Sequence, residues 1–279
     1  MEYQGKMETI QFWKMNGSGN DFILIDNMNG LIKDEELSRF VERVCRRRES
    51  VGADGVILVT RSDRYDFGWR FLNADGGEVE MCGNGGRCVS RFAFLKGIAG
   101  PKMTFKTLAG PISAEVKGRT VKILMPGPNG LDMDIDLEEH QGWKTVDFIN
   151  TGVPHVVVQV EDISSHPVTE QGRVIRSHVL FSPEGTNANF MRQIGKDQLE
   201  IRTYERGVED ETLACGTGAI ACALVASLRG MVSSPVKVRT RGGEDLIIHF
   251  QRSGGSFDEV WLQGNTSIVY RAQLHHEAL

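Results

Sequence analysis

The sequence predicts two domains of one architecture, in the α/β class (α+β type), each with many short strands and one long apolar helix. The first observation is an internal repeat. The stretch around Cys82, from Glu78 to Gly97, recurs in one register around Cys215, 133 positions later (215 − 82 = 133). A period this long indicates a duplicated domain, because solenoid repeats are much shorter. The second observation is length, since 279 residues suffice for two separate cores.

The first half shows a strand, a polar turn at Asn16–Asp21 and a second strand. Asp34 is the expected N-cap of an amphipathic helix whose apolar stripe ends at Cys45. The stretch from Asn84 to Lys96 is expected to form the central helix. Gly and Pro residues separate the remaining strands. The expected strands are Phe22–Ile25, Val56–Val59, Trp69–Asn73, Met103–Thr107, Ile112–Val116 and Val121–Met125.

The second half repeats this scheme after a linker expected at Pro126–Gly130. Its helix, from about Gly218 to Leu228, is apolar on nearly all sides. Such a helix is expected to lie buried inside a curved sheet. The expected strands are Val146–Ile149, His155–Val160, Leu199–Tyr204, Val236–Thr240, Leu246–Phe250 and Glu259–Leu262.

The repeat extends to three polar loops at the same offset, which predicts an alignment of the halves without a gap. In that alignment Asn73 falls opposite Arg206. The matched loops and pairs are Gly19–Phe22 with Gly152–His155, Gly52–Gly55 with Gly185–Ala188, Cys82 with Cys215, Gly83 with Gly216, and Gly85 with Gly218.

Composition excludes several function classes. A net charge of −5 gives no electrostatic footprint for nucleic acid, and the basic run Arg46–Arg48 is interpreted as a solvated helix end. The N-terminus has no secretory signal, and no apolar run reaches the ~20 residues of a membrane span. Five cysteines without framework spacing indicate free thiols in a reducing compartment. We therefore expect a cytoplasmic protein.

The two Cys-Gly-x-Gly loops at helix entrances are the candidate catalytic elements. A helix N-terminus stabilises a thiolate, and the glycines let backbone N–H groups approach an anion closely. The arrangement suits a carboxylate held between two helix ends with a thiol on either side. A single such cysteine is more often an inert, buried apolar residue. The matched pair, Cys82 and Cys215, favours the catalytic interpretation.

Other sites fit these loops less well. The gaps from Cys82 to Cys88 and from Cys215 to Cys222 are too wide for the usual spacing of zinc ligands. Neither glycine loop has the pattern of a nucleotide-binding loop. Because Cys88 and Cys222 do not fall at matched repeat positions, they are assigned to packing.

Seven motifs in order resemble the diaminopimelate epimerase family over roughly Phe12 to Val269. Cofactor-independent racemases of the proline racemase type also share paired cysteines. The motifs are Gly19–Phe22, Asn73–Gly76, Cys82–Cys88, Pro154-His155, Asn187–Phe190, Tyr204–Gly207 and Ala214–Gly218.

The resemblance implies two homologous domains of antiparallel strands, each wrapped around a central helix, with the site in the cleft between them. Applied here, the boundaries are residues 1–127 plus 266–279 for the N-terminal domain and 128–265 for the C-terminal domain. It implies conversion of LL- to meso-diaminopimelate, without metal, pyridoxal phosphate or nicotinamide, on the route to lysine and peptidoglycan. It also suggests a homodimer.

The resemblance also implies roles for individual residues. Cys82 and Cys215 are the acid/base thiols, and His155 and Glu205 adjust them. Binding of the substrate is implied for Asn20, Asn73, Gly83, Asn84, Asn187, Glu205, Arg206, Gly216 and Thr217. Inversion at a carbon requires a base on one face and an acid on the other, so one cysteine starts as thiolate and the other as thiol. Helix-end donors in a water-poor cleft neutralise the reacting carboxylate.

Two positions depart from the family pattern. Val153 replaces an Asn that usually helps to bind the distal end of the substrate, and Gly55 stands where some members carry Gln. These departures leave open a racemase of the same fold acting on another amino acid. A thiol redox sensor using Cys82 and Cys215 as a disulfide couple is a third hypothesis. A binding module without catalysis is disfavoured, since binding requires no matched thiols.

Overall fold

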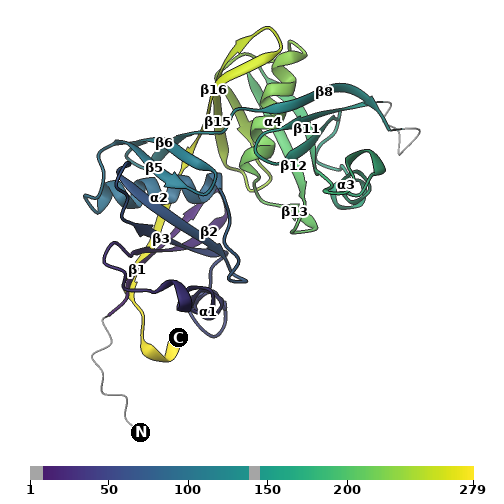
Figure 1. Cartoon of the computed structure of the whole chain (residues 1–279). Helices are drawn as coiled ribbons and strands as arrows, with labels where there is room; N and C mark the ends of the chain where they lie inside the picture. Colours follow the sequence, from purple (N-terminus) through teal and green to yellow (C-terminus); the bar gives the residue numbers. More distant parts are fainter. Residues whose placement is uncertain (1–8, 138–144) are drawn as a thin grey trace. The chain divides into compact units, whose positions relative to one another are not determined.

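A computed structural model describes residues 9–137 and 145–279. The described chain divides into two compact units, Met1–Ile123 with Asn265–Leu279 and Leu124–Gly264. The sequence-based boundaries, at residues 127/128 and 265/266, lie close to these limits. The C-terminal strand therefore returns to the first unit, as the trace in Figure 1 shows.

The first unit holds a sheet whose neighbouring strands run in the order β17-β1-β2-β3-β4-β5-β6-β7. The strands are β1 (Gln11–Gly17), β2 (Asn20–Asp26), β3 (Gly55–Thr60), β4 (Phe67–Asn73), β5 (Lys102–Thr107), β6 (Gly110–Lys117), β7 (Thr120–Leu124) and β17 (Ser267–Gln273). Two neighbouring pairs, β2–β3 and β4–β5, are parallel, and the others are antiparallel. The parallel pairs are those connected through a helix, as crossover geometry requires.

The second unit repeats this order as β8-β9-β10-β11-β12-β14-β15-β16. The strands are β8 (Asn129–Asp136), β9 (Thr145–Asn150), β10 (Pro154–Gln159), β11 (Asn187–Gly195), β12 (Gln198–Glu205), β14 (Val236–Arg239), β15 (Asp245–Ser253) and β16 (Ser256–Asn265), with β13 (Asp210–Thr212) beside β12. The two parallel pairs, β10–β11 and β12–β14, again flank a helical connection. The mixed sheet thus refines the expectation of antiparallel strands.

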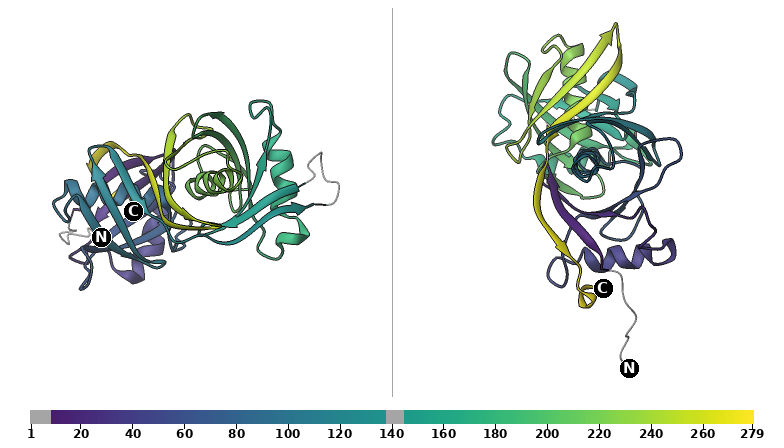
Figure 2. Two further views of the ribbon diagram at one scale, coloured as in Figure 1. Left: turned by 90° about the horizontal axis from the view of Figure 1, so that it is seen from above. Right: turned by 90° about the vertical axis from the view of Figure 1, so that its left-hand side faces the viewer.

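Each unit has a central helix that its own strands enclose, and Figure 2 shows α4 encircled in this way. Helix α2 runs over Gly83–Leu95 and helix α4 over Gly216–Leu228. In α4 every residue from Gly218 to Ser227 is buried, and the sequence contains no charged side chain over that span. The expectation of an apolar helix inside a curved sheet is confirmed.

A second helix packs on the outer face of each sheet. Helix α1 (Asp34–Val44) buries Leu37, Phe40, Val41 and Val44 in one core cluster, and α3 (Val168–Arg176) lies on β11 and β12. Strands β2, β3, β10 and β11 are therefore covered on both faces. This double burial explains the nearly continuous apolar runs of β2, β3 and β10.

Several element boundaries differ from the sequence-based expectation. The N-cap of α1 is Lys33 rather than Asp34, which begins the helix. The last two residues of the expected linker Pro126–Gly130 belong to β8, and the expected loop Gly185–Ala188 ends inside β11. Strand β11 begins Asn-Ala-Asn, a polar pattern typical of a loop, yet its first five residues are buried.

The gap-free alignment of the halves is wrong in the strands. Phe22 lies opposite Gly55, whereas His155 lies opposite Asn187, so β3 matches β11 at an offset of 132 (187 − 55 = 132). The same offset relates β4 to β12. Asn73 therefore corresponds to Glu205 rather than to Arg206.

A pair of matched ion pairs supports this register. Arg70 donates from Nε and Nη2 to the two carboxylate oxygens of Glu78. Arg202 donates from the same two nitrogens to Glu211. The arginines are 132 positions apart and the glutamates 133, so the offset returns to its original value before each cysteine loop.

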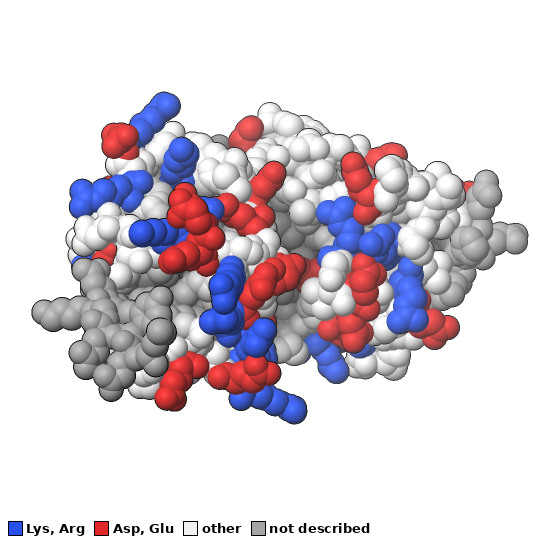
Figure 3. Space-filling view, turned by 60° about the horizontal axis from the view of Figure 1, so that its bottom comes forward, with Lys and Arg blue, Asp and Glu red and all other residues white. Residues whose placement is uncertain are grey.

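No helix in the described ranges, 9–137 and 145–279, is long and apolar enough to cross a membrane. Charged side chains of both signs are interspersed on the face shown in Figure 3. This mixture agrees with the composition, in which acidic residues exceed basic ones only slightly.

Candidate active site

Cys82 is the N-cap of α2, and its backbone is extended. The Gly85 N–H donates to Cys82 Sγ at 3.4 Å. Gly85 leaves little room for a side chain, because a Cβ there would lie 3.1 Å from Ile57 Cδ1. The helix start therefore directs a backbone N–H at the thiol, and its dipole favours the thiolate.

Cys215 occupies the same place at the start of α4. The Gly218 N–H donates to Cys215 Sγ at 3.4 Å, and the Thr217 hydroxyl lies 3.5 Å from that sulfur. A Cβ on Gly218 would lie 2.3 Å from Asn189 Oδ1, so only glycine fits. The two cysteine loops, Cys82–Gly85 and Cys215–Gly218, are thus built alike within their units.

A polar network lies behind the Cys82 loop. Asn84 Nδ2 donates to Asn20 Oδ1 at 2.7 Å, and Asn20 Nδ2 donates to Asp54 Oδ2 at 2.9 Å. Arg87, fully buried, donates to Asn84 Oδ1 and to Gly83 O. Because the Asn84 side chain is engaged on both sides, its backbone N–H at the helix start is what it offers an anion.

A different network lies behind the Cys215 loop. Asn189 Nδ2 lies 3.0 Å from His155 Nδ1 and donates to Val156 O at 2.8 Å. The Thr203 hydroxyl donates to Asn189 Oδ1 at 3.0 Å. His155 and Asn189 have no solvent exposure, and Thr203 has almost none.

Burial sets the protonation of the two expected thiol modulators. Burial lowers the pKa of His155 to about 3, and the positive charge of Arg206 acts in the same direction. His155 is therefore a neutral imidazole at neutral pH, and it can affect a thiolate only through a hydrogen bond. Burial raises the pKa of Glu205, against a hydrogen bond from the Thr212 hydroxyl.

The other predicted binding residues of the second unit gather at the ends of β10, β11 and β12. Asn187 lies opposite His155 in the sheet, and its Oδ1 accepts from the Arg206 N–H at 2.7 Å. The Arg206 guanidinium donates to Glu184 O. Gly216 and Thr217 form the first turn of α4, where N–H groups have no partner within the helix.

Asn73 is exposed at the end of β4, opposite Gly55. The following residue, Ala74, donates its N–H to Asp54 O, so the Asn73 turn contacts the loop whose Asp54 side chain binds Asn20. The first unit thus brings Asn20, Asn73 and Asn84 into one connected group of loops.

The structure explains one of the two departures from the family pattern, Gly55, and not the other, Val153. A Cβ on Gly55 would lie 2.4 Å from Leu72 O and 2.6 Å from Phe71 Cε2, so a larger residue there requires the strand to move. Val153 is half-buried in the β9–β10 turn, and its carbonyl accepts from Thr151. Nothing in the structure explains why this position is apolar.

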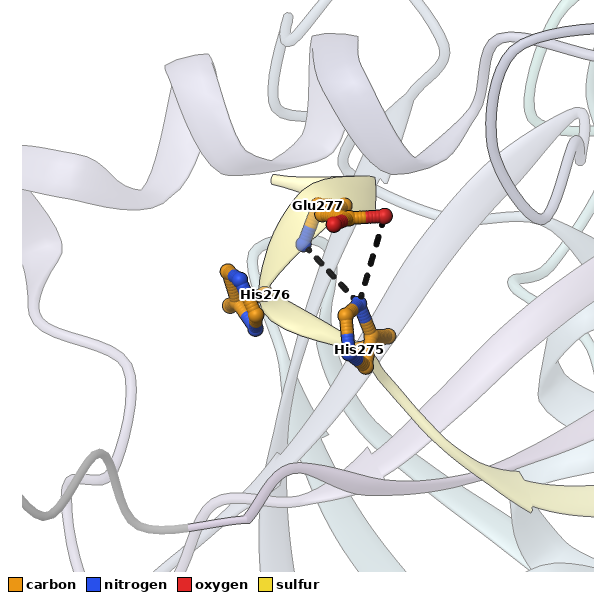
Figure 4. A group of neighbouring side chains, drawn as sticks. All are labelled: His275, His276 and Glu277. Carbon is orange, nitrogen blue, oxygen red and sulfur yellow. Dashed lines mark hydrogen bonds and ion pairs between the residues drawn. The ribbon is translucent and has the colours of Figure 1, made fainter.

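Cys88 and Cys222 are fully buried inside their helices, in agreement with a packing role. The described residues contain one group with metal-ligand spacing, the exposed His275, His276 and Glu277 near the C-terminus (Figure 4). His275 Nδ1 there accepts from the Glu277 N–H, a local turn contact. This group is separate from both cysteine loops in the chain and includes no predicted site residue.

Sequence analysis did not assign Asn189, Arg87 or Asp54. The signal for Asn189 was present in the alternation of Asn187 and Asn189, which places both on one face once the segment is recognised as a strand. Arg87 falls on the inner side of a helix start, where its burial depends on the polar atoms of Ser18 and Asn84.

The model of the family described as "Diaminopimelate epimerase" matches residues 12–130 and 148–264, most of both units. The chain belongs to the diaminopimelate epimerase family. A family member from Aquifex aeolicus (strain VF5) is 47% identical over 284 residues, covering 97% of this chain and 99% of that protein. A member from Archaeoglobus fulgidus is 45% identical, covering 84% and 87%. Both are named diaminopimelate epimerase.

Solved structures confirm that the fold extends beyond this family. A PhzF-family phenazine biosynthesis protein of Bacillus anthracis superposes with a TM-score of 0.71 at 16% identity, covering 96% of this chain and 99% of that one. A probable proline racemase from Agrobacterium radiobacter K84 gives 0.69 at 17% identity, covering 96% and 93%. At such identities the likeness concerns the diaminopimelate epimerase-like fold alone.

Proposed function

We propose that this protein inverts one α-carbon of LL-2,6-diaminopimelate to give the meso isomer, with Cys82 and Cys215 as the two acid/base thiols. The observation that carries the proposal is the repeated helix start. Each unit presents one cysteine sulfur that accepts a glycine N–H at 3.4 Å. Membership in the diaminopimelate epimerase family supports the substrate.

The reaction requires the two thiols to act on opposite faces of one carbon. One cysteine, as thiolate, removes the α-proton, and the other, as thiol, delivers a proton to the opposite face. The roles exchange in the reverse direction. The helix-start N–H groups of Gly83, Asn84, Gly216 and Thr217 bind the reacting carboxylate and stabilise the charge that develops on it.

The distal end of the substrate is an amino acid of fixed configuration. We assign its recognition to Arg206 with Asn73 and Asn187, and we assign Asn20 and Glu205 as further substrate contacts. Arg206 supplies a guanidinium for the distal carboxylate through charge-assisted hydrogen bonds. Asn187 accepts the Arg206 N–H and so fixes the strand end that carries this arginine. No cofactor takes part in these steps, which need only proton transfer.

The test is incubation with LL-diaminopimelate in deuterated water under reducing conditions. The expected product is the meso isomer with one solvent deuteron at the inverted α-carbon. Inversion without deuterium uptake would overturn the two-thiol mechanism. Activity that appears only in the oxidised protein would favour a redox couple instead, because a disulfide removes both thiols from acid/base work.

A second candidate is a racemase of the same fold acting on another amino acid, and Val153 is the observation that favours it. Comparing turnover of LL-diaminopimelate with that of common L-amino acids separates the two. The variant Val153→Asn, which restores the usual family residue, is compared with wild type on the same substrates. An increase in turnover of LL-diaminopimelate, with no change for monocarboxylic amino acids, supports a distal-site effect.

We further propose a homodimer in the cytoplasm. The free cysteines support the compartment, because a reducing environment keeps thiols unpaired. Sedimentation equilibrium of the reduced protein tests the assembly, with twice the mass of the 31.0 kDa chain as the expected result. A single species at the mass of one chain would refute the dimer.

A further inference from the structure

Three buried positions differ in chemistry between the two otherwise matched sheets. In the first unit, Ile57 lies opposite Phe71 in the β3–β4 pair. In the second unit, Asn189 lies opposite Thr203 at the corresponding place in β11–β12. The neighbouring strands β2 and β10 contribute Phe22 and His155. An apolar set thus corresponds to a polar one.

Both sets face the central helix of their unit. Ile57 Cδ1 would lie 3.1 Å from a Cβ placed on Gly85, and Asn189 Oδ1 would lie 2.3 Å from one placed on Gly218. In the first unit, the rings of Phe22 and Phe71 pack edge to face with centroids 5.7 Å apart. Asn189 therefore packs on the residue whose N–H binds Cys215 Sγ.

The bonds of Asn189 fix the tautomer of His155. The Val156 carbonyl can only accept and the Thr203 hydroxyl donates to Oδ1, so the amide nitrogen faces Val156 and His155 Nδ1. An amide nitrogen only donates, so Nδ1 accepts. The imidazole proton is therefore on Nε2.

The Nε2 atom of His155 is buried and has no hydrogen-bond partner among the described residues. A buried donor without an acceptor destabilises a fold by roughly 1–3 kcal/mol. The first unit shows that apolar side chains can fill the three corresponding positions of a matched sheet. The polar set is therefore better explained by the reaction than by folding.

We propose that Asn189, supported by Thr203, is a positioning residue that holds His155 as the Nε2–H tautomer near the start of α4. At that place the Nε2–H of His155 donates to an anionic acceptor. The acceptor is either the Cys215 thiolate or a substrate group that takes the place of the thiolate. This role rests on the proposed function, and it assigns His155 a hydrogen bond rather than a proton transfer. In this role Asn189 transfers no proton itself and acts only through the imidazole.

The decisive experiment is a double-variant cycle that uses the pair already present in the first unit. Asn189→Ile and His155→Phe are each expected to lower kcat at least tenfold, with KM changed less. The double variant, which carries the Phe/Ile pair, is expected to lose no more than His155→Phe alone, because Asn189 acts through the imidazole. Independent, multiplicative losses would overturn the proposal.

A second measurement does not depend on turnover. In wild-type protein with ¹⁵N-labelled histidine, the His155 nitrogens are expected to show the Nε2–H tautomer. Asn189→Asp replaces the amide donor with an acceptor, so the proton is expected to move to Nδ1. An Nδ1–H tautomer in wild-type protein, or no change in Asn189→Asp, would refute the assignment.

The matched control is Ile57→Val, at the position in the first unit that corresponds to Asn189. It is expected to keep kcat within twofold of wild type. A tenfold loss there would mean that packing behind either cysteine loop controls the rate, which contradicts a specific role for Asn189. If wild type does not turn over LL-diaminopimelate, the proposed function fails, whereas the tautomer measurement still tests the positioning of His155.

Discussion

Cys82 and Cys215 begin matched helices and accept the same backbone contact at 3.4 Å, yet the side chains behind them differ. Behind Cys82 lies the buried cation of Arg87, connected through Asn84 to Asn20. Behind Cys215 lies the neutral set of His155, Asn189 and Thr203. At the position that matches Arg87, α4 has Ile220.

The comparison separates two requirements of the reaction. In the proposed mechanism both faces of one carbon need a thiol with the same backbone support, and the duplicated helix start would supply it. The two halves of the substrate are not equivalent, because only one end reacts. Side chains, which change more easily than a backbone, supply this asymmetry. The predictions below test the two levels separately.

The largest effect is expected from removing either thiol. Cys82→Ala and Cys215→Ala should each lower kcat for inversion by at least about 10³-fold, since a positioned acid or base contributes roughly 10²–10⁴-fold. Chiral chromatography of the products measures it. The control is Cys45→Ala, in the core beneath α1, which should stay within twofold. One fully active thiol variant would remove the symmetry on which the mechanism depends.

A smaller effect, on stability, is expected at Arg87. Arg87→Met removes the guanidinium donor from Asn84 Oδ1, so the free energy of unfolding in urea should fall by about 2 kcal/mol. At the matched position Ile220→Met conserves volume and should cost below about 1.5 kcal/mol. Equal losses of unfolding free energy in the two variants would show that the two helix starts have the same electrostatic support. That result would contradict the difference described above.

His155 should make stability depend on pH. Its pKa is about 3 in the folded protein and about 6.5 when unfolded, so below pH 6.5 the unfolded chain binds a proton that the folded one does not. Stability should therefore fall as the pH decreases from 6.5, by up to about 1.4 kcal/mol per pH unit, with no contribution above 6.5. His155→Phe should remove that slope. An unchanged slope between pH 6 and pH 4.5 would contradict a buried neutral imidazole.

The smallest difference is expected between the matched ion pairs. Arg202 is less exposed than Arg70, with 13% against 29% of the side chain accessible, and Arg70 also binds Asp34. Glu211→Gln should therefore cost about 2 kcal/mol of unfolding free energy and Glu78→Gln about 1 kcal/mol. Thermal unfolding of the two variants, side by side, measures the difference. The reverse order would mean that burial does not set the strength of these pairs.

Much of the fold could be predicted from the sequence because its signals are local. The apolar run of α4 and the cysteine repeat predicted the buried helices within two residues of their starts. The pattern of Leu37, Phe40 and Val44 predicted α1 in the same way. Parallel pairing of β2 with β3 was not predicted, since it depends on the helical crossover rather than on either strand.

In the candidate site, too, the residues with a local sequence signal were predicted and those that depend on distant partners were not. The cysteines and glycines at the helix starts were found because their spacing has a physical meaning. Asn189 was missed because a buried amide in a strand looks like a loop residue until its partners, His155 and Thr203, are known. The engaged side chain of Asn84 was not foreseeable, because it depends on Arg87 and Asn20 from separate turns.

The change of offset between the two sheets has a consequence for how the duplicated gene diverged. One residue is missing between Gly185 and β11 relative to Gly52 and β3, and one is added between β12 and Glu211 relative to β4 and Glu78. The two length changes cancel. The segment between Gly52 and Cys82 and the segment between Gly185 and Cys215 therefore both contain 29 residues. Compensating insertions and deletions of this kind shift a strand by one residue and keep the cysteine loop that follows it in its original register. They offer a duplicated enzyme a way to acquire a new set of inward-facing groups in one copy alone.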